Sequence, residues 1–187
     1  MALAQYRILG ITDAKILYNN ASAVAEVDLH FVNNVEIEPE EETIEFEGDD
    51  QKVKRFAISG MSGTITLDTI DILDLGGTGG FAKTEQTALT GIASRTYWGD
   101  ETESAGITRG LRFRAKAEKL SDGSTKDVDI IVFRARISAV RPPSLSNKAK
   151  AQLQLRFSAE RATTDIAGGA LTGVPTNGAF WAFDERS

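Results

Sequence analysis

Hydrophobic and polar residues alternate with a period of two along most of this chain, which is typical of strands with one buried and one solvated face. The alternation is clearest over residues 111–118, 128–139 and 151–160, and Asp122-Gly123 supplies a turn between the first two runs. Three strands are therefore expected, each with one apolar phase. The apolar phases are Leu111, Phe113, Ala115 and Ala117; Ile131, Phe133, Ala135, Ile137 and Ala139; and Leu153, Leu155, Phe157 and Ala159.

The N-terminal half predicts further strands, and two of them are rich in acid. Segments 35–39 and 43–48 are expected to be the two arms of one hairpin, with Pro39 and Gly48 as its breaks. The other expected strands cover residues 6–12, 14–18, 23–32, 54–59 and 63–68. A short helix is predicted at residues 69–75, capped by Asp68 and followed by Gly76. Residues 76–110 lack periodicity and predict a long flexible loop.

Charge is distributed unevenly along the chain. Residues 36–50 contain nine carboxylates and no Lys or Arg, whereas the rest of the chain holds 21 basic and 18 acidic residues. A mildly basic body with one strongly acidic segment, at about 35–55, suggests a chain that recognises copies of itself. It does not favour nucleic-acid binding, which usually needs a concentrated basic face. The acidic residues are Glu36, Glu38, Glu40, Glu41, Glu42, Glu45, Glu47, Asp49 and Asp50.

Composition limits the class of protein further. A chain of 187 residues with 41% hydrophobic residues suits one globular domain, and no apolar run is long enough for a bilayer helix or a secretory signal. Cys is absent, so disulfides and thiolate chemistry are excluded. We therefore expect no membrane anchor and a place of synthesis inside the cell.

Candidate motifs for catalysis or cofactor binding are weak. Residues 77–84 approach a phosphate-binding loop, but Ala82 replaces a required glycine and the surrounding strands do not suit that motif. His30 is the single histidine and has no nucleophile motif beside it. The acidic segment lacks the register of a Ca²⁺ loop, and nothing selects two of its acids for glycoside hydrolysis. The sequence predicts no enzyme, no cofactor and no metal.

Basic residues occupy the polar phase of the three best-defined strands. If these strands pair, the cations form a stripe on one sheet face that either is simply solvated or meets something negative, since acidic partners look sparse on those strands. We expect charge reversal of this stripe to block self-association without unfolding the chain. The basic residues are Arg112, Arg114, Lys116, Arg134, Arg136 and Arg156.

The C-terminal segment ends on aromatic residues after a Gly- and Thr-rich stretch. Phe180, Trp181 and Phe183 either fold back onto their own sheet or dock on a neighbour, because exposed aromatics disfavour solubility unless a partner covers them.

In order, these features resemble the tail-tube (major tail) proteins of long-tailed bacteriophages over residues 23–168. The resemblance is carried by IEPEEETIEFEGDDQKVKRFAISGMSGTITLDTIDILDL (37–75) and DVDIIVFRARISAVRPPSLSNKAKAQLQLRFSAERATTDIAGG (127–169). In that family a charged hairpin is followed by a strand of small residues and a short helix. A late strand then follows a Pro-containing loop.

The resemblance implies a mainly β fold, either a β-sandwich or a partly closed β-barrel with one short flanking helix. Residues 1–168 would form this domain and residues 169–187 a C-terminal extension. Family members stack as sixfold rings into a hollow tube that conducts DNA without binding it specifically. The implied location is the virion tail, with assembly in the host cytoplasm beside other tail proteins (tape measure, terminator and baseplate).

Two roles for the acidic hairpin remain open. Its carboxylates could pair with the basic stripe of another copy, or they could line the lumen and repel DNA phosphates. A different class of function also remains open, namely a non-catalytic β-sandwich that binds a receptor or glycan through Tyr97-Trp98.

Overall fold

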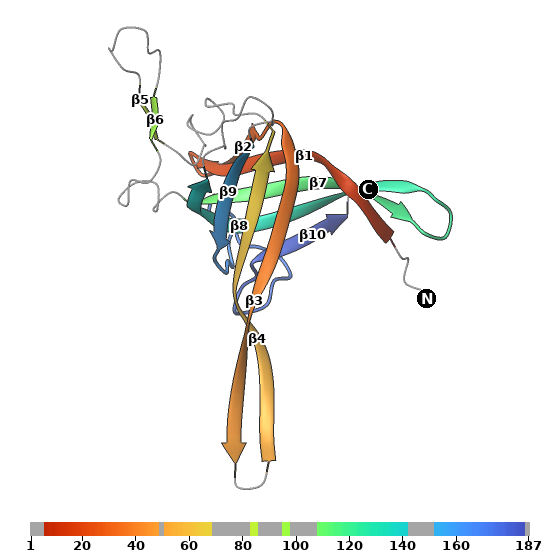
Figure 1. Ribbon diagram of the computed structural model, residues 1–187, viewed down its shortest axis with the longest axis vertical. Helices are drawn as coiled ribbons and strands as arrows, with labels where there is room; N and C mark the ends of the chain where they lie inside the picture. The colour runs from red at the N-terminus through yellow and green to blue at the C-terminus, as the bar shows by residue number, and fades with distance from the viewer. Residues whose placement is uncertain are drawn as a thin grey trace.

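A computed structural model describes residues 6–48, 51–68, 83–85, 95–97, 108–141 and 152–185. They form one large antiparallel sheet, with strand order β2-β1-β7-β8-β9-β4-β3 and β10 paired to β8, and one small sheet of β5 and β6 (Figure 1). The strands are β1 (Tyr6–Asn20), β2 (Ala23–Asp28), β3 (Val32–Gly48), β4 (Gln51–Leu67), β5 (Lys83–Glu85), β6 (Arg95–Tyr97), β7 (Arg109–Lys119), β8 (Thr125–Arg141), β9 (Leu153–Ala159) and β10 (Trp181–Glu185).

The expectation of a mainly β fold with an extended hairpin is confirmed. The three strands predicted from the clearest alternation are β7, β8 and β9. The predicted helix at 69–75 and most of the predicted loop at 76–110 lie outside the described residues. Within the described residues, no helix has the length and apolarity needed to cross a bilayer.

The core lies on one face of the curled sheet, because every contributing strand alternates. On β7 and β9, buried residues follow each other at every second position. Large side chains such as Phe113 and Phe157 are almost fully buried there. The remaining core members include Ala14, Ile16, Leu29, Met61, Ile65, Leu67, Leu111, Val132, Ala135, Leu153, Leu155, Ala159 and Phe180.

The sheet curls around this core without closing into a barrel. Its two terminal strands, β2 and β3, are joined by residues 29–31 alone. Leu29 is buried in this connection, and its backbone N–H donates to the Ala14 carbonyl at 2.8 Å. Phe31, which follows, has a φ of 60° and is 62% exposed. The single strand predicted at 23–32 is therefore two strands, because the chain must turn here to pass from one sheet edge to the other.

The prediction of the acidic hairpin was wrong about which segments pair. Segments 35–39 and 43–48 are not opposite arms; both belong to β3, which pairs along its whole length with β4. Pro39 does not break β3, since β3 is an edge strand and a missing N–H on its free side costs no ladder bond. Segments 54–59 and 63–68 likewise merge into β4, and 6–12 and 14–18 merge into β1, with bulges in place of the expected breaks.

The expected phase of β8 was wrong in its N-terminal half. Val132 is fully buried and Ile130 packs against the core, whereas Ile131 and Phe133 were expected there. The register against β7 shifts between Arg109 and Leu111, so β8 carries one extra residue between Val132 and Ala135. This bulge changes which side chains face the core, because one extra residue inverts a period of two.

Gly63 provides a test of this packing. A Cβ at position 63 would clash with the Phe157 ring and with the Glu36 carbonyl on the next strand. We expect Gly63→Ala to destabilise the fold by about 1–3 kcal/mol, as overpacked cores do, measured by urea denaturation. The matched control is Ser62→Ala on the opposite face of β4, which should have little effect. Equal stability of both variants would contradict the described contact.

Candidate assembly interface

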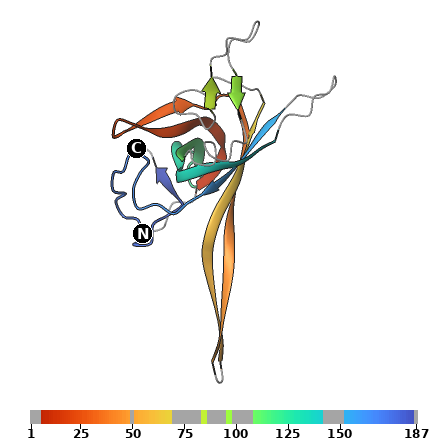
Figure 2. The ribbon, with the colours of Figure 1, turned by 90° about the vertical axis from the view of Figure 1, so that its left-hand side faces the viewer.

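The β3–β4 hairpin projects from the body as a two-stranded ribbon (Figures 1 and 2). Both strands have 17 residues, but β9 pairs with β4 only from Met61 onward. Residues 40–60 therefore form ladder bonds only with each other among the described strands. We call this part the ribbon. An isolated two-stranded hairpin is marginally stable in water, so a ribbon of this length favours a partner surface.

The base of the ribbon is a bulge held by the body. Glu40 lies opposite Gly60 and Glu41 opposite Ile58, so Ser59 is the extra residue. The Ser59 hydroxyl donates to the Glu40 carbonyl at 3.2 Å. Arg161 donates to the Ile58 carbonyl, and its guanidinium lies 4.9 Å from the centre of the Phe180 ring. The bulge increases the local twist, and these contacts fix the direction in which the ribbon leaves the body.

Five predicted acidic residues lie where the ribbon meets the body. Their strand partners on β4 are small or apolar, and no cation lies directly opposite them. All five are exposed, and none forms an ion pair with another described side chain. Like charges this close are unfavourable unless something positive covers them. We call these residues the acidic edge: Glu36, Glu38, Glu40, Glu41 and Glu42.

Nearer the end of the ribbon, the register places Glu45 opposite Lys54 and Glu47 opposite Lys52. The sequence hypothesis counted both acids as uncompensated, because it took the two halves of β3 as partners. Asp49 and Asp50 lie outside the described residues.

Two of the predicted cations share a sheet face with the acidic edge. One row of aligned residues runs Glu36, Thr64, Arg156 across β3, β4 and β9. The row beside it runs Glu38, Ser62, Ser158, Arg136, and reaches β8. Neighbouring strands are about 4.8 Å apart, so an uncharged strip of small side chains separates acids from cations. This face is therefore negative on β3 and positive on β9 and β8.

Arg112 and Arg114 lie on the same outer side of the sheet, but they are paired within their own chain, which corrects the expectation that acidic partners are sparse on these strands. Arg114 Nε donates to Asp129 Oδ1 at 2.8 Å, and this hydrogen bond raises the pKa of Arg114. Arg112 donates to both oxygens of Glu26, and its Nε lies 3.9 Å from Asp129 Oδ2. These arginines are neutralised inside their own chain and are not available for an acidic neighbour.

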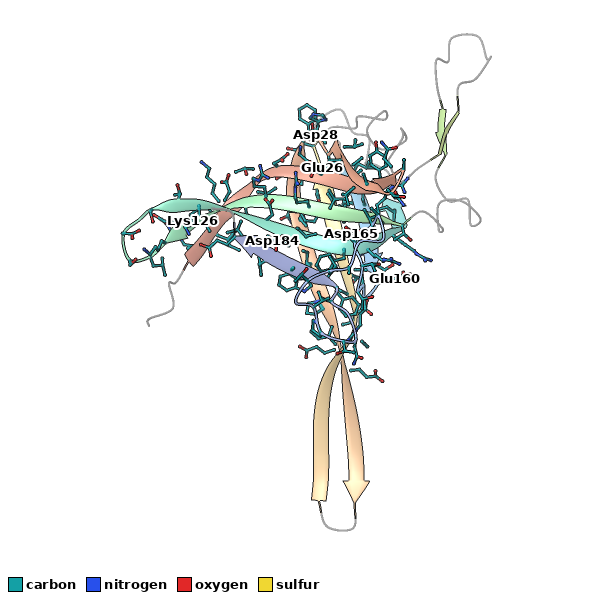
Figure 3. The ribbon with its side chains drawn as sticks, turned by 180° about the vertical axis from the view of Figure 1, so that it is seen from behind. Glu26, Asp28, Lys126, Glu160, Asp165 and Asp184 are labelled. Atoms are coloured by element: carbon teal, nitrogen blue, oxygen red, sulfur yellow. The ribbon has the colours of Figure 1, made fainter. Side chains whose placement is uncertain are left out.

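The same network extends to the edge strand β2. Lys15 Nζ lies 3.3 Å from Glu26 Oε2 and 3.1 Å from Asp28 Oδ1. The pKa of Lys15 is raised, chiefly by the hydrogen bond to Asp28. Figure 3 shows Glu26 and Asp28 at the end of the body remote from the ribbon. The charges thus join β2, β1, β7 and β8 on the side of the sheet opposite the core.

The partner of the arginines could have been found from the sequence. A turn at residues 121–124 makes the hairpin register place Arg114 opposite Asp129, as observed. The signal was missed because the alternation of β8 was extended backwards through the bulge. That error put Asp129 on the core phase and made acidic partners look sparse.

The remaining predicted cations differ in their surroundings. Arg134 donates to the Thr164 hydroxyl at 2.9 Å. Arg136 Nε lies 3.1 Å from Glu160 Oε1. Lys116 and Arg156 are exposed, and neither forms an ion pair with another described side chain.

The aromatic C-terminus folds back onto its own sheet, through β10, while remaining partly uncovered. Phe180 is buried, and β10 pairs with β8 from Trp181↔Val132 onward. Trp181 and Phe183 are 38% and 52% exposed, and their rings meet edge to face with centroids 4.6 Å apart. Phe180 therefore completes the core, whereas Trp181 and Phe183 remain partly exposed at the surface.

The described residues contain no group of three or more His, Asp or Glu side chains placed to hold a metal ion. Most of the near-phosphate loop at 77–84 and Trp98 of the proposed glycan-binding pair lie outside the described residues.

No protein-family model and no curated protein matches this chain. Among solved structures, it is similar to the tube-terminating cap of the anti-feeding prophage, with 13% identity, a TM-score of 0.47, and coverage of 86% of this chain and 91% of that chain. It is also similar to a chain of the extended sheath–tube complex of an extracellular contractile injection system (PVC), with 11% identity, a TM-score of 0.43, and coverage of 79% and 84%. At these identities and scores, neither match assigns a function to this chain.

The charge network generates a stability prediction. Asp129 is 2% exposed, and Asp129→Ala would leave Arg112 and Arg114 without their shared carboxylate. We expect a loss of about 3 kcal/mol in the free energy of unfolding, as when one partner of a buried ion pair is removed. The matched control is Asp127→Ala, on the same face but less buried, which should cost under about 0.5 kcal/mol. Urea denaturation measures both, and equal losses would show that the network is not stabilising.

Proposed function

We propose that this chain is a non-catalytic structural virion protein that assembles into stacked, hexameric rings and forms the tail tube through which DNA passes. The ring size, the tube and the passage of DNA rest on the resemblance of residues 23–168 to tail-tube proteins. On this proposal, the protein works in the virion tail, after assembly in the host cytoplasm, and its other partners are tail proteins at the ends of the tube.

The observation that carries the proposal is the acidic edge at the base of a projecting ribbon. Glu36 and Glu38 are exposed on an edge strand whose outer side has no partner among the described strands. Glu36 on β3 and Arg156 on β9 share a row, with Thr64 on β4 between them. A surface that is negative along one strand and positive along another is complementary to a shifted copy of itself.

Such a contact uses two different patches on the two copies. Head-to-tail contacts of this kind form rings when their rotation closes and filaments when it does not. They suit a subunit that must build both a ring and a stack. Charge complementarity would mainly set the alignment of neighbours and the rate of association. We therefore favour contact between subunits over lumen lining as the role of the acidic edge.

The proposal predicts that the purified protein forms rings or hollow tubes of uniform width. Electron microscopy should show them at low salt, and analytical ultracentrifugation should show dissociation as the ionic strength rises, because exposed charges are screened. Monomers alone, across a wide range of concentration and salt, would contradict the proposal.

Charge reversal tests the two complementary charged positions directly. The double variant Glu36→Lys/Glu38→Lys and the single variant Arg156→Glu should each raise the concentration needed for assembly by about tenfold or more, equivalent to about 1.4 kcal/mol. Their melting temperatures should stay close to that of the unaltered protein, since these side chains are exposed.

Mixing the two variants is the matched control for this test. Lysines on one chain then face a glutamate on the other, so mixed assemblies should form at a lower concentration than either variant alone requires. Absence of this rescue, in proteins that remain folded by circular dichroism, would contradict pairing of the acidic edge with Arg156.

A further inference from the structure

Arg161 links the base of the ribbon to the C-terminal part of the chain. The ladder between β4 and β9 ends at the pair Met61↔Ala159, so Ile58 lies beyond the strand that attaches β4 to the body. Arg161 donates to the carbonyl oxygen of Ile58, and its guanidinium lies 4.9 Å from the centre of the Phe180 ring. Arg161 therefore holds the first residues of the ribbon at the point where ladder bonds to the body have stopped.

The backbone on both sides of Arg161 is held by hydrogen bonds. Before it, the N–H of Glu160 donates to the carbonyl oxygen of Arg134 at 2.9 Å. After it, Ala162 and Ala179 exchange two backbone hydrogen bonds of 2.9 and 3.0 Å. Arg161 is itself exposed, but it projects from a well-supported part of the body.

The ring of Phe180 gives the guanidinium a fixed support. Phe180 is 9% exposed and belongs to the core, and its carbonyl oxygen accepts a hydrogen bond from the N–H of Phe133 at 3.1 Å. A cation over an aromatic ring is attracted by the negative face of the ring. A planar guanidinium also donates in fixed directions, so little freedom is lost for each hydrogen bond that it forms. We call the contact of Arg161 with Ile58 and Phe180 the brace.

The ribbon has a natural bending point at its base. Ser59 is the extra residue of the bulge, and a bulge bends the strand that carries it. From Glu40 to Gly48 the ribbon extends about 27 Å, at about 3.4 Å per residue (Figures 1 and 2). A tilt of roughly 10° at the bulge would move the far end by about 5 Å, which is close to one strand spacing. The angle at the base therefore decides which part of a neighbouring chain the ribbon reaches.

We propose that Arg161 is a positioning residue for assembly, because the brace holds the ribbon at the angle at which it meets a second copy of the chain. This inference deepens the proposed function and rests on it. It also gives the C-terminal segment a role in assembly, since that segment supports the ribbon from within its own chain.

Distances between two spin labels measure the angle of the ribbon before assembly. The chain contains no cysteine, so Gln51→Cys at the far end of the ribbon and Lys116→Cys on β7 carry the labels without background. Double electron–electron resonance is recorded at high salt, which screens the charges that the proposed function uses for assembly. The variant is Arg161→Ala. The matched control is Arg7→Ala, which removes an equally charged, exposed side chain from β1.

We expect Arg161→Ala to widen the distribution of label distances by about twofold or more, and to raise the concentration needed for assembly by about tenfold. Analytical ultracentrifugation of the unlabelled proteins measures the second effect. Arg7→Ala should change neither quantity, and both variants should keep the melting temperature of the unaltered protein, since both arginines are exposed.

An unchanged distance distribution in Arg161→Ala, or assembly at the concentration that the unaltered protein requires, would overturn the inference and leave the proposed function standing. A lower melting temperature without a wider distribution would also overturn it, because that result shows a structural role only. Monomers alone from the unaltered protein would overturn the proposed function, and this inference with it.

A second variant tests the brace from the side of the core. Phe180→Leu keeps an apolar side chain in the core but removes the ring beneath the guanidinium. It should widen the distance distribution, and adding it to Arg161→Ala should widen it no further, because both changes break the same contact. Additive widening would overturn the brace. If Arg161→Ala does not fold, Phe180→Leu alone decides, and an unchanged distribution then contradicts the proposal.

Discussion

The structure depends on a mismatch in strand length within one antiparallel sheet. β3 and β4 have 17 residues each, whereas β9, which attaches them to the body, has seven. Ladder bonds can attach only as much of β4 as β9 covers, so the rest of the hairpin must leave the body as a two-stranded ribbon. Both edges of this ribbon then lack a partner among the described strands, and the proposed contact between copies rests on this geometry.

The same geometry sorts the charges into two groups with different roles. On the side opposite the core, Arg112, Arg114 and Lys15 meet Asp129, Glu26 and Asp28, and this internal network joins four strands. On the same side of the sheet, over β3, β4 and β9, the acidic edge and Arg156 lie apart with small residues between them. Internal neutralisation stabilises the chain, whereas the proposed contact between copies rests on the charges left apart.

The sequence predicted a large part of this arrangement. Alternation located β7, β8 and β9, and the count of carboxylates located the ribbon and the acidic edge. The register of the β7–β8 hairpin was also within reach of the sequence, since the turn at 121–124 determines that Arg114 faces Asp129. The contact of Arg161 with the base of the ribbon was not predictable in the same way. Arg161 and Ile58 are 103 positions apart in the chain and come together only because β9 pairs with β4.

By itself, the sequence determined which segments are strands and where net charge accumulates, because both properties depend on residues close together in the chain. The tertiary structure alone decided which strands are neighbours, which half of β8 faces the core, and which charges are already paired. One extra residue at Phe133–Arg134 changes which side chains of β8 face the core. The seven-residue length of β9 determines how much of β4 is attached to the body and how much projects as the ribbon. Such features depend on contacts between distant segments, and local alternation carries no information about them.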